Sequence, residues 1–357
     1  MRILKDAGVR IAALALIVTA LVGCAANGAE AGGSGDAGRV AFMLPEAKTT
    51  RYESADRPYF EERLSQVCPD CELIYSNADG DASKQQQQAE SALAQNIDVL
   101  VLDPVDASAA LSIVAAANAR GVPVIAYDRE IPGADLAYFV SSDSEAVGAL
   151  QAEALVSSLT AAGKPDGNIL MVNGSPTDSN ASDFKKGAHR VIDASELNII
   201  GEYDSPDWSP DKAQEWAAGQ VVLHDGLIDG IYAANDGTAG GAIAALKAAG
   251  ITELPLVTGQ DAELTAIQRI VAGDQYMTVY KAISTQAYAA ADAAFQLMTG
   301  GTITADTEID GVPSTLLEPI AVTKDNIMET VVADGFYTVQ QICTDQYAAA
   351  CVAAGIE

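Results

Sequence analysis

Short apolar runs alternate along the chain, from Arg39 onward, with alanine-rich stretches in which apolar residues recur at helical spacing. Ten of these runs have the length and the β-branched content of buried strands. They are RVAFML (39–44), CELIYS (71–76), IDVLVLD (97–103), VPVIAYD (122–128), AYFVSSD (137–143), GNILMVNG (167–174), NIIGEYD (198–204), DGIYAAND (229–236), LPLVTGQD (254–261) and QYMTVYK (275–281). We therefore expect ten strands that alternate with helices.

The stretches between the runs carry helix signals. ASAALSIVAAANARG (107–121) and GGAIAALKAAG (240–250) have apolar residues at helical spacing and end in Gly121 and Gly250. Strands that alternate with helices are typical of doubly wound parallel sheets in an α/β protein. Ten strands are many for one sheet, so we expect two similar lobes of about five strands each.

Polar residues gather where the apolar runs stop. They are Asp103, Asp128–Arg129, Ser141–Asp143, Asn173, Asp204, Asn235–Asp236, Gln260–Asp261 and Lys281. In open α/β sheets, ligands bind outside the carboxyl ends of the strands. Two lobes that face each other by these edges would enclose a polar cleft, and rigid strand ends would hold its side chains in fixed positions.

The start of the chain has the pattern of an export signal. Arg2, Lys5 and Arg10 precede the apolar run IAALALIVTALV (11–22), which is too short to span a bilayer. The following LVGC resembles a bacterial lipobox, in which Cys24 would become the acylated N-terminus. We expect residues 1–24 to be a lipoprotein signal peptide, residues 25–38 to be a flexible tether, and the protein to be anchored to the outer face of the cytoplasmic membrane.

The net charge of the chain restricts the kinds of partner that it can bind. The chain has 20 Lys and Arg against 49 Asp and Glu, and loss of residues 1–24 would remove three basic residues and one acidic residue. The exported chain would then carry 17 basic and 48 acidic residues, a formal charge of −31. Such a surface repels nucleic acid and anionic headgroups, so we expect no nucleic-acid partner and membrane contact only through the lipid anchor.

Four cysteines remain besides Cys24, and an even number in an exported protein predicts disulfides. Three pairings can form, and we favour the two local ones, Cys68 with Cys71 and Cys343 with Cys351. A redox role for the CPDC motif is disfavoured because its first cysteine ends a predicted helix instead of beginning one. No histidine lies near these cysteines in the sequence, so we expect no zinc site.

No catalytic motif stands out. VNGSP (172–176) lacks the second glycine of a serine nucleophile elbow, and His189 and His224 suit surface or capping roles. The metalloprotease, P-loop and dinucleotide-binding signatures are missing from the sequence. We expect no catalytic residue, metal or cofactor, although paired carboxylates for glycoside hydrolysis remain an open alternative.

The polar residues at the strand ends instead suit a neutral polyol. A carboxylate can accept hydrogen bonds from two hydroxyls at once, while Arg, Lys and Asn donate to ring and hydroxyl oxygens. An aromatic ring covers the apolar face of a sugar, and Trp208, in the loop SPDWSP (205–210), is the candidate. Trp216 falls at helical spacing and is predicted to be a packing residue.

Seven motifs, in order along the chain, resemble those of the exported sugar-binding proteins of ABC importers, in particular the xylose-binding branch and also the multi-sugar-binding members. The motifs are AYDR (126–129), GSPTDSNA (174–181), WSP (208–210), NDGTAGGAIAALKAAG (235–250), GQDAEL (259–264), AGDQYMTVYK (272–281) and LLEPIAV with DGFY (316–322 and 334–337). The resemblance covers residues 39–337. It implies the type I periplasmic-binding-protein fold and a binding protein instead of an enzyme.

The resemblance also implies which side chains contact the sugar. Carried over by position, they are Arg51, Asp128, Arg129, Asp178, Asn180, Trp208, Asn235, Asp261 and Lys281. Two positions depart from the family pattern. Ser179 replaces the first of two asparagines that commonly follow the aspartate, and Tyr52 stands where tryptophan is frequent.

In this interpretation the first lobe comprises residues 39–142 and 284–316, the second lobe comprises residues 143–283 and 317–357, and three crossings form a hinge. A bound monosaccharide, xylose or a related aldose, would favour the closed monomer, which would deliver it to an ABC permease. A co-receptor for a membrane sensor kinase and an exported sugar-modifying enzyme are the alternatives. A sugar-responsive repressor is disfavoured because an export signal stands where a helix-turn-helix would be.

Overall fold

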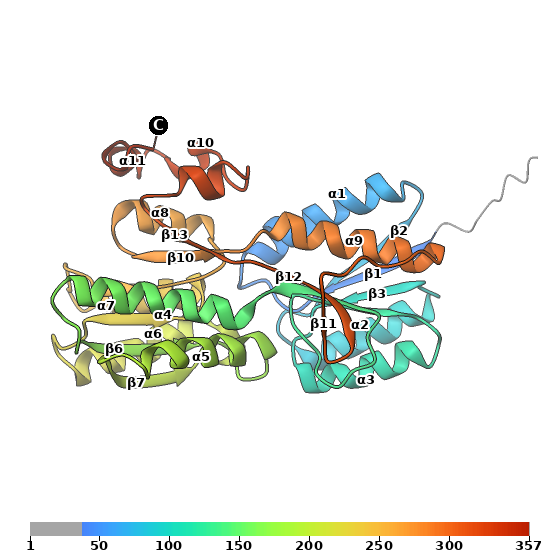
Figure 1. Ribbon diagram of the computed structural model, residues 1–357, viewed down its shortest axis with the longest axis horizontal. Coiled ribbons are helices and arrows are strands. Elements are labelled where there is room, and N and C mark those ends of the chain that lie inside the picture. Colours follow the sequence, from blue (N-terminus) through green and yellow to red (C-terminus); the bar gives the residue numbers. More distant parts are fainter. Residues whose placement is uncertain (1–37, 357) are drawn as a thin grey trace, which may run out of the picture. The chain divides into compact units, whose positions relative to one another are not determined.

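Parallel strands form the two main sheets of the computed structural model, which describes residues 38–356 (Figure 1). The larger sheet has the strand order β11-β12-β5-β4-β3-β1-β2. Its strands are β1 (Arg39–Leu44), β2 (Glu72–Asn77), β3 (Val99–Leu102), β4 (Val124–Tyr127), β5 (Tyr138–Ser142), β11 (Thr307–Ile309) and β12 (Val312–Leu317). Only the β11–β12 pair is antiparallel within this sheet. The order 2-1-3-4-5 of its first five strands is that of a doubly wound sheet.

The second sheet repeats this order. Its four strands run β7-β6-β8-β9, and a separate antiparallel pair is formed by β10 and β13. The strands are β6 (Asn168–Asn173), β7 (Asn198–Asp204), β8 (Gly230–Ala233), β9 (Leu256–Val257), β10 (Met277–Tyr280) and β13 (Ile320–Thr323). The Tyr276 N–H donates to the Val257 carbonyl (2.9 Å) and the Val279 N–H to the Gly259 carbonyl (3.0 Å), so β10 lies beside β9 as the fifth strand.

Helices cover both faces of each sheet (Figure 1). They are α1 (Arg57–Val67), α2 (Ala82–Ala94), α3 (Ala107–Asn118), α4 (Ser144–Ala161), α5 (Ser179–Ile192), α6 (Pro210–Leu223), α7 (Asp236–Ala248), α8 (Leu264–Ala272), α9 (Ile283–Thr299), α10 (Val339–Ile342) and α11 (Ala348–Ala354), with the short turns η1 (Tyr52–Asp56), η2 (Pro206–Trp208) and η3 (Met328–Val332). Alternate residues of β1 point to opposite faces of the sheet. Ala41 and Met43 pack with α2 and α3, whereas Val40 and Phe42 pack with α1 and α9.

We call the elements around the seven-stranded sheet the first lobe, and those around the second sheet and the β10–β13 pair the second lobe. The chain passes from one set of strands to the other after β5, after β10 and after β12. All ten predicted strands are present. The structure adds β11, β12 and β13, so the first sheet is larger than the sequence pattern predicted. β11 and β13 have only three and four residues, and few positions of the three strands are buried, so their apolar pattern is weak.

Several smaller expectations have direct counterparts in the structure. Gly121 and Gly250 follow helices with left-handed φ angles of 73° and 80°, a conformation that glycine adopts without strain. Disulfides join Cys68 to Cys71 and Cys343 to Cys351, the two local pairings. Trp216 stacks on Tyr203 with ring centroids 5.4 Å apart, as a packing residue.

The N-terminal expectations cannot be compared with the fold. The predicted signal peptide (1–24) with Cys24, and residues 25–37 of the predicted tether, lie outside the described residues. Between residues 38 and 356, no helix combines the length and the apolar character that crossing a membrane requires.

Candidate binding site

Side chains from the carboxyl ends of strands in both lobes converge on one small cavity. Its walls are formed by Thr49, Tyr52, Asp128, Arg129, Asp178, Asn180, Phe184, Trp208, Asn235, Gln260, Asp261 and Lys281. Eight of the nine predicted site residues are among them, and the ninth, Arg51, lies directly behind. The cavity encloses about 10 Å³, roughly the space of one water molecule, so its polar groups mainly contact one another.

Two aspartates occupy corresponding places in the two sheets. Asp128 follows β4 and donates its N–H to the Val140 carbonyl of β5, while Asp261 follows β9 and donates its N–H to the Val279 carbonyl of β10, both at 2.9 Å. Both have left-handed backbones, with φ of 61° and 95°. Residues other than glycine adopt this conformation rarely, and such strain clusters at functional sites. The turn takes each carboxylate off its strand and into the cavity wall.

Arg51 connects these two carboxylates. Its Nε and Nη2 pair with the Asp56 carboxylate at 2.8 and 2.6 Å, within the first lobe. Its Nη1 lies 3.5 Å from Asp128 Oδ1 and 3.4 Å from Asp261 Oδ1 in the second lobe. Burial alone would raise the pKa of Asp128, but Arg51 and Lys281 outweigh burial and hold that pKa below its ordinary value. Asp128 is therefore an ionised hydrogen-bond acceptor.

Lys281 completes this charge network. Its Nζ lies 2.9 Å from Asp261 Oδ1, and both side chains are only 3% exposed. Lys281 is therefore not a solvated surface charge. Asp261 is not the cap of α8 either, because Glu263 occupies the N-cap position of that helix.

Arg129 forms a second connection between the lobes. Its Nε lies 2.9 Å from Asp178 Oδ2, and Trp208 Nε1 donates to the same oxygen at 2.8 Å. Asp178 also caps α5 by accepting from the Asn180 N–H. Asp128 and Arg129 are thus not a self-contained ion pair, since the charged partner of each comes from a different segment of the chain.

The two asparagines have double roles. Asn180 Nδ2 donates to the Asp128 carbonyl at 3.1 Å, a further contact between the lobes. Asn235 Oδ1 accepts from the Thr238 N–H at 2.8 Å and caps α7, and the residue also lines the cavity. Capping and cavity lining are therefore combined at Asn235.

Four wall residues, Thr49, Tyr52, Phe184 and Gln260, were not among the nine predicted site residues. Gln260 was one of the polar residues at strand ends, and its Oε1 has no hydrogen-bond partner within residues 38–356. Phe184 faces inward from α5, where its sequence position resembles that of any core residue. Thr49 belongs to the loop after β1 and carries no distinguishing signal. Tyr52, which stands where tryptophan is frequent in the family, donates its hydroxyl to Asp128 Oδ2 at 3.1 Å.

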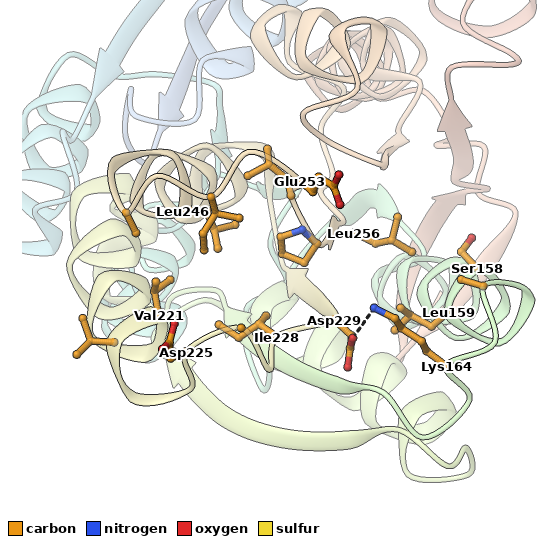
Figure 2. Close-up of a pocket in the computed structure, with 17 residues that line it drawn as sticks. Ser158, Leu159, Lys164, Val221, Asp225, Ile228, Asp229, Leu246, Glu253 and Leu256 are labelled. Carbon is orange, nitrogen blue, oxygen red and sulfur yellow. Dashed lines mark hydrogen bonds and ion pairs between the residues drawn. The ribbon is translucent and has the colours of Figure 1, made fainter.

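A larger cavity of about 820 Å³ lies in the second lobe (Figure 2). Ile228 and Asp229 precede β8, and Leu256 begins β9, so this cavity is at the amino ends of the strands, opposite the converging site. Its wall is largely aliphatic, and the ion pair between Lys164 and Asp229 (2.8 Å) lies at one side. Unlike the small cavity, it has no aromatic side chain among the described residues of its wall.

The fold and the site together define a binding protein of the type I periplasmic class, with a polar site between the carboxyl ends of two doubly wound sheets. Residues 40–302 match the family model described as periplasmic binding protein domain. The chain belongs to this family.

Named relatives agree with this membership. The chain is 38% identical over 312 residues to a D-xylose-binding periplasmic protein of Haemophilus influenzae, covering 85% of this chain and 92% of the relative. It is 31% identical to the multiple sugar-binding periplasmic receptor ChvE of Rhizobium radiobacter, covering 86% and 93%. A solute-binding protein of Clostridium phytofermentans, solved with β-D-glucose, is 27% identical, with a TM-score of 0.78 and coverage of 85% and 99%.

Proposed function

We propose that this chain is the substrate-binding protein of a carbohydrate ABC importer, and that it binds one monosaccharide, xylose or a related aldose, between its lobes. The observation that carries this proposal is the convergence of Asp128, Asp261 and Trp208 in one buried cavity. Two carboxylates and an indole are the groups that a pyranose ring with several hydroxyls requires. The names of the relatives support the same ligand class.

The contact lengths suggest how a sugar enters the network. Arg51 holds Asp56 at 2.6 and 2.8 Å, but it is 3.4 Å or more from Asp128 and Asp261. Sugar hydroxyls can replace these longer contacts while the pair with Asp56 stays intact. A ligand that lacks one of these hydroxyls would leave a buried group unpaired, at about 1–3 kcal/mol for each such group.

Entry of the sugar requires the lobes to separate, because the cavity encloses only about 10 Å³. We propose that residues 39–142 with 284–316 move as one lobe, that residues 143–283 with 317–357 move as the other, and that the three crossings act as the hinge. A sugar that contacts both lobes favours the closed form by its differential affinity. The closed monomer would then be recognised by a membrane permease.

The proposed location follows from the family and from the start of the sequence. Periplasmic binding proteins are exported. We propose in addition that the signal peptide within residues 1–24 is cleaved before Cys24, which becomes the N-terminus and carries the lipid anchor. Globomycin, which inhibits the lipoprotein signal peptidase, should cause the precursor to accumulate, and Cys24→Ala should abolish incorporation of labelled palmitate.

A receptor role is a second candidate, because one relative is named a sugar-binding receptor. The same closed form would then contact a sensor kinase instead of a permease. Crosslinking in membranes of the native host, with and without sugar, separates the two roles by the partner that is captured. We propose no chemical step, since the named relatives are binding proteins.

Isothermal titration of the full chain with a panel of aldopentoses, aldohexoses and polyols tests the binding proposal. We expect saturable binding of D-xylose or a related aldose at one site per chain. Asp128→Ala should abolish the heat signal. Asp98→Asn is the matched control, because Asp98 accepts from the Arg39 N–H (2.7 Å) at the opposite end of the same sheet. No heat with any sugar of the panel would refute the proposal.

A further inference from the structure

Asp103 is a buried carboxylate that the proposed binding mechanism does not use. It follows β3 at the carboxyl end of the first-lobe sheet, and its side chain is fully buried. Among the described residues, neither of its carboxylate oxygens has a hydrogen-bond donor. Its charged neighbour is Arg129, whose Nε lies 3.5 Å from Asp103 Oδ1. A buried carboxylate without donors is costly, so its presence calls for an explanation.

The backbone of Asp103 is held rigidly. Its N–H donates to the Met43 carbonyl at 2.9 Å, and its carbonyl accepts from Gln85 Nε2 at 2.8 Å. Gln85 Oε1 in turn accepts from the Val105 N–H at 2.9 Å. These contacts all lie within the first lobe, so the position of the Asp103 backbone does not depend on the second lobe.

Arg129 is shared between the lobes. In the first lobe its Nη1 donates to the Pro104 carbonyl (3.0 Å) and its Nη2 to the Tyr52 hydroxyl (3.2 Å). Its closest carboxylate, at 2.9 Å, is Asp178 of the second lobe. Asp103 is the more distant alternative at 3.5 Å. One guanidinium thus lies between two carboxylates that separate when the lobes part.

We propose that Asp103 competes with Asp178 for Arg129 and thereby sets the balance between the open and the closed form. The proposal rests on the lobe closure described under the proposed function. In the closed form Asp178 has the shorter contact. In the open form Asp178 leaves with α5, and Asp103 neutralises a guanidinium that would otherwise face the cleft without a counter-ion. Asp103 does not line the cavity, so it is a positioning residue that acts through Arg129.

The same geometry implies that a proton bound at Asp103 changes the balance between the open and the closed form. Burial raises the pKa of Asp103 well above its ordinary value, and Arg129 lowers it only in part. The charged and titratable groups that face Asp103 are Arg129, Asp128, Asp178, Arg51 and Tyr52. Neutral Asp103 cannot compete for Arg129, so proton uptake favours the closed form, and a fall in pH shifts the ligand-free protein toward closure.

Asp103→Asn tests the proposal, because it removes the charge and keeps the shape. In small-angle X-ray scattering of the ligand-free full chain, we expect a smaller radius of gyration and a closed-to-open ratio raised at least about fivefold. Stopped-flow tryptophan fluorescence should show D-xylose associating more slowly, in proportion to the lower fraction of open protein, since the closed form excludes the sugar. Asp178→Asn should instead increase the radius of gyration and raise the rate of D-xylose association.

Asp98→Asn is the matched control, since Asp98 precedes β3 and Asp103 follows it. As the pH is lowered from 8 to 5, the rate of D-xylose association with the wild type should decrease. The rate in Asp103→Asn should change less over the same pH range. The proposal is overturned if Asp103→Asn matches Asp98→Asn in scattering and rate, or if Asp178→Asn does not open the protein. If the wild type binds no sugar, the proposed function fails, while scattering of the ligand-free variants still decides the role of Asp103.

Discussion

Gly174 gives the sharpest test of the position of Trp208. A Cβ atom built on Gly174 would lie 2.0 Å from Trp208 Cη2 and 2.3 Å from Cζ2, far inside van der Waals contact. Gly174→Ala therefore forces the indole to move by roughly 1.5 Å, to the normal carbon–carbon separation. The movement breaks the 2.8 Å hydrogen bond from Trp208 Nε1 to Asp178.

The magnitude follows from that bond. A hydrogen bond to a charged group contributes about 1.5–3 kcal/mol, which corresponds to about a 10- to 150-fold weaker Kd for the sugar. Isothermal titration with D-xylose measures this change, and thermal unfolding checks that the variant folds. Gly219→Ala is the control. Gly219 lies within α6 with no atom near the added methyl group, so affinity should be unchanged and stability should rise by up to about 1 kcal/mol. Sugar binding at wild-type affinity in Gly174→Ala would refute this placement of the indole.

Three further outcomes are expected. Gln260→Met removes the unpartnered Oε1 from the cavity wall, and titration should show D-xylose binding about 3- to 10-fold weaker, whereas unchanged affinity would exclude contact with the sugar. Burial lowers the pKa of His189, but hydrogen bonds to Glu202 and Asp193 outweigh burial and raise it. Protonated His189 therefore stabilises the folded protein. This contribution is fully present below the unfolded pKa near 6.5 and is lost as pH rises through the folded pKa. Denaturant unfolding should therefore show up to about 1 kcal/mol less stability at pH 8.5 than at pH 6, and His189→Gln should remove that difference. Replacing Cys343 and Cys351 with alanine opens a short loop and should cost about 2.5 kcal/mol or less of unfolding free energy, and an unchanged denaturation midpoint would contradict this.

The strand pattern could be predicted because buried parallel strands are nearly continuous apolar runs, and all ten are present. The late strands β11 to β13 could not be identified in the same way. β11 lies at a sheet edge and β13 in a two-stranded pair, and in each of the three strands most residues are only partly buried or exposed. Their places depend on long-range pairing, such as Ser314 with Phe139, which local periodicity does not encode.

The site residues at strand ends could be predicted from the sequence, whereas an aromatic wall residue on a helix could not. Asp128 directly follows β4, Asn235 lies two residues after β8 and Asp261 four residues after β9, so the chemistry of strand ends identified them. Phe184 lies on a helix, where inward-facing aromatic residues are common, and its place in the cavity wall depends on how α5 approaches the other lobe. Asp103 was recognised as a residue at a strand end. Its relation to Arg129 required the measured distances.

A crystal structure of the protein grown with D-xylose tests the central claim most directly. The account predicts one sugar between the lobes, with hydroxyls on the carboxylates of Asp128 and Asp261 and with the ring against Trp208. Sugar bound only in the aliphatic cavity beside Ile228, with the Arg51 contacts to both aspartates unchanged, would contradict the account.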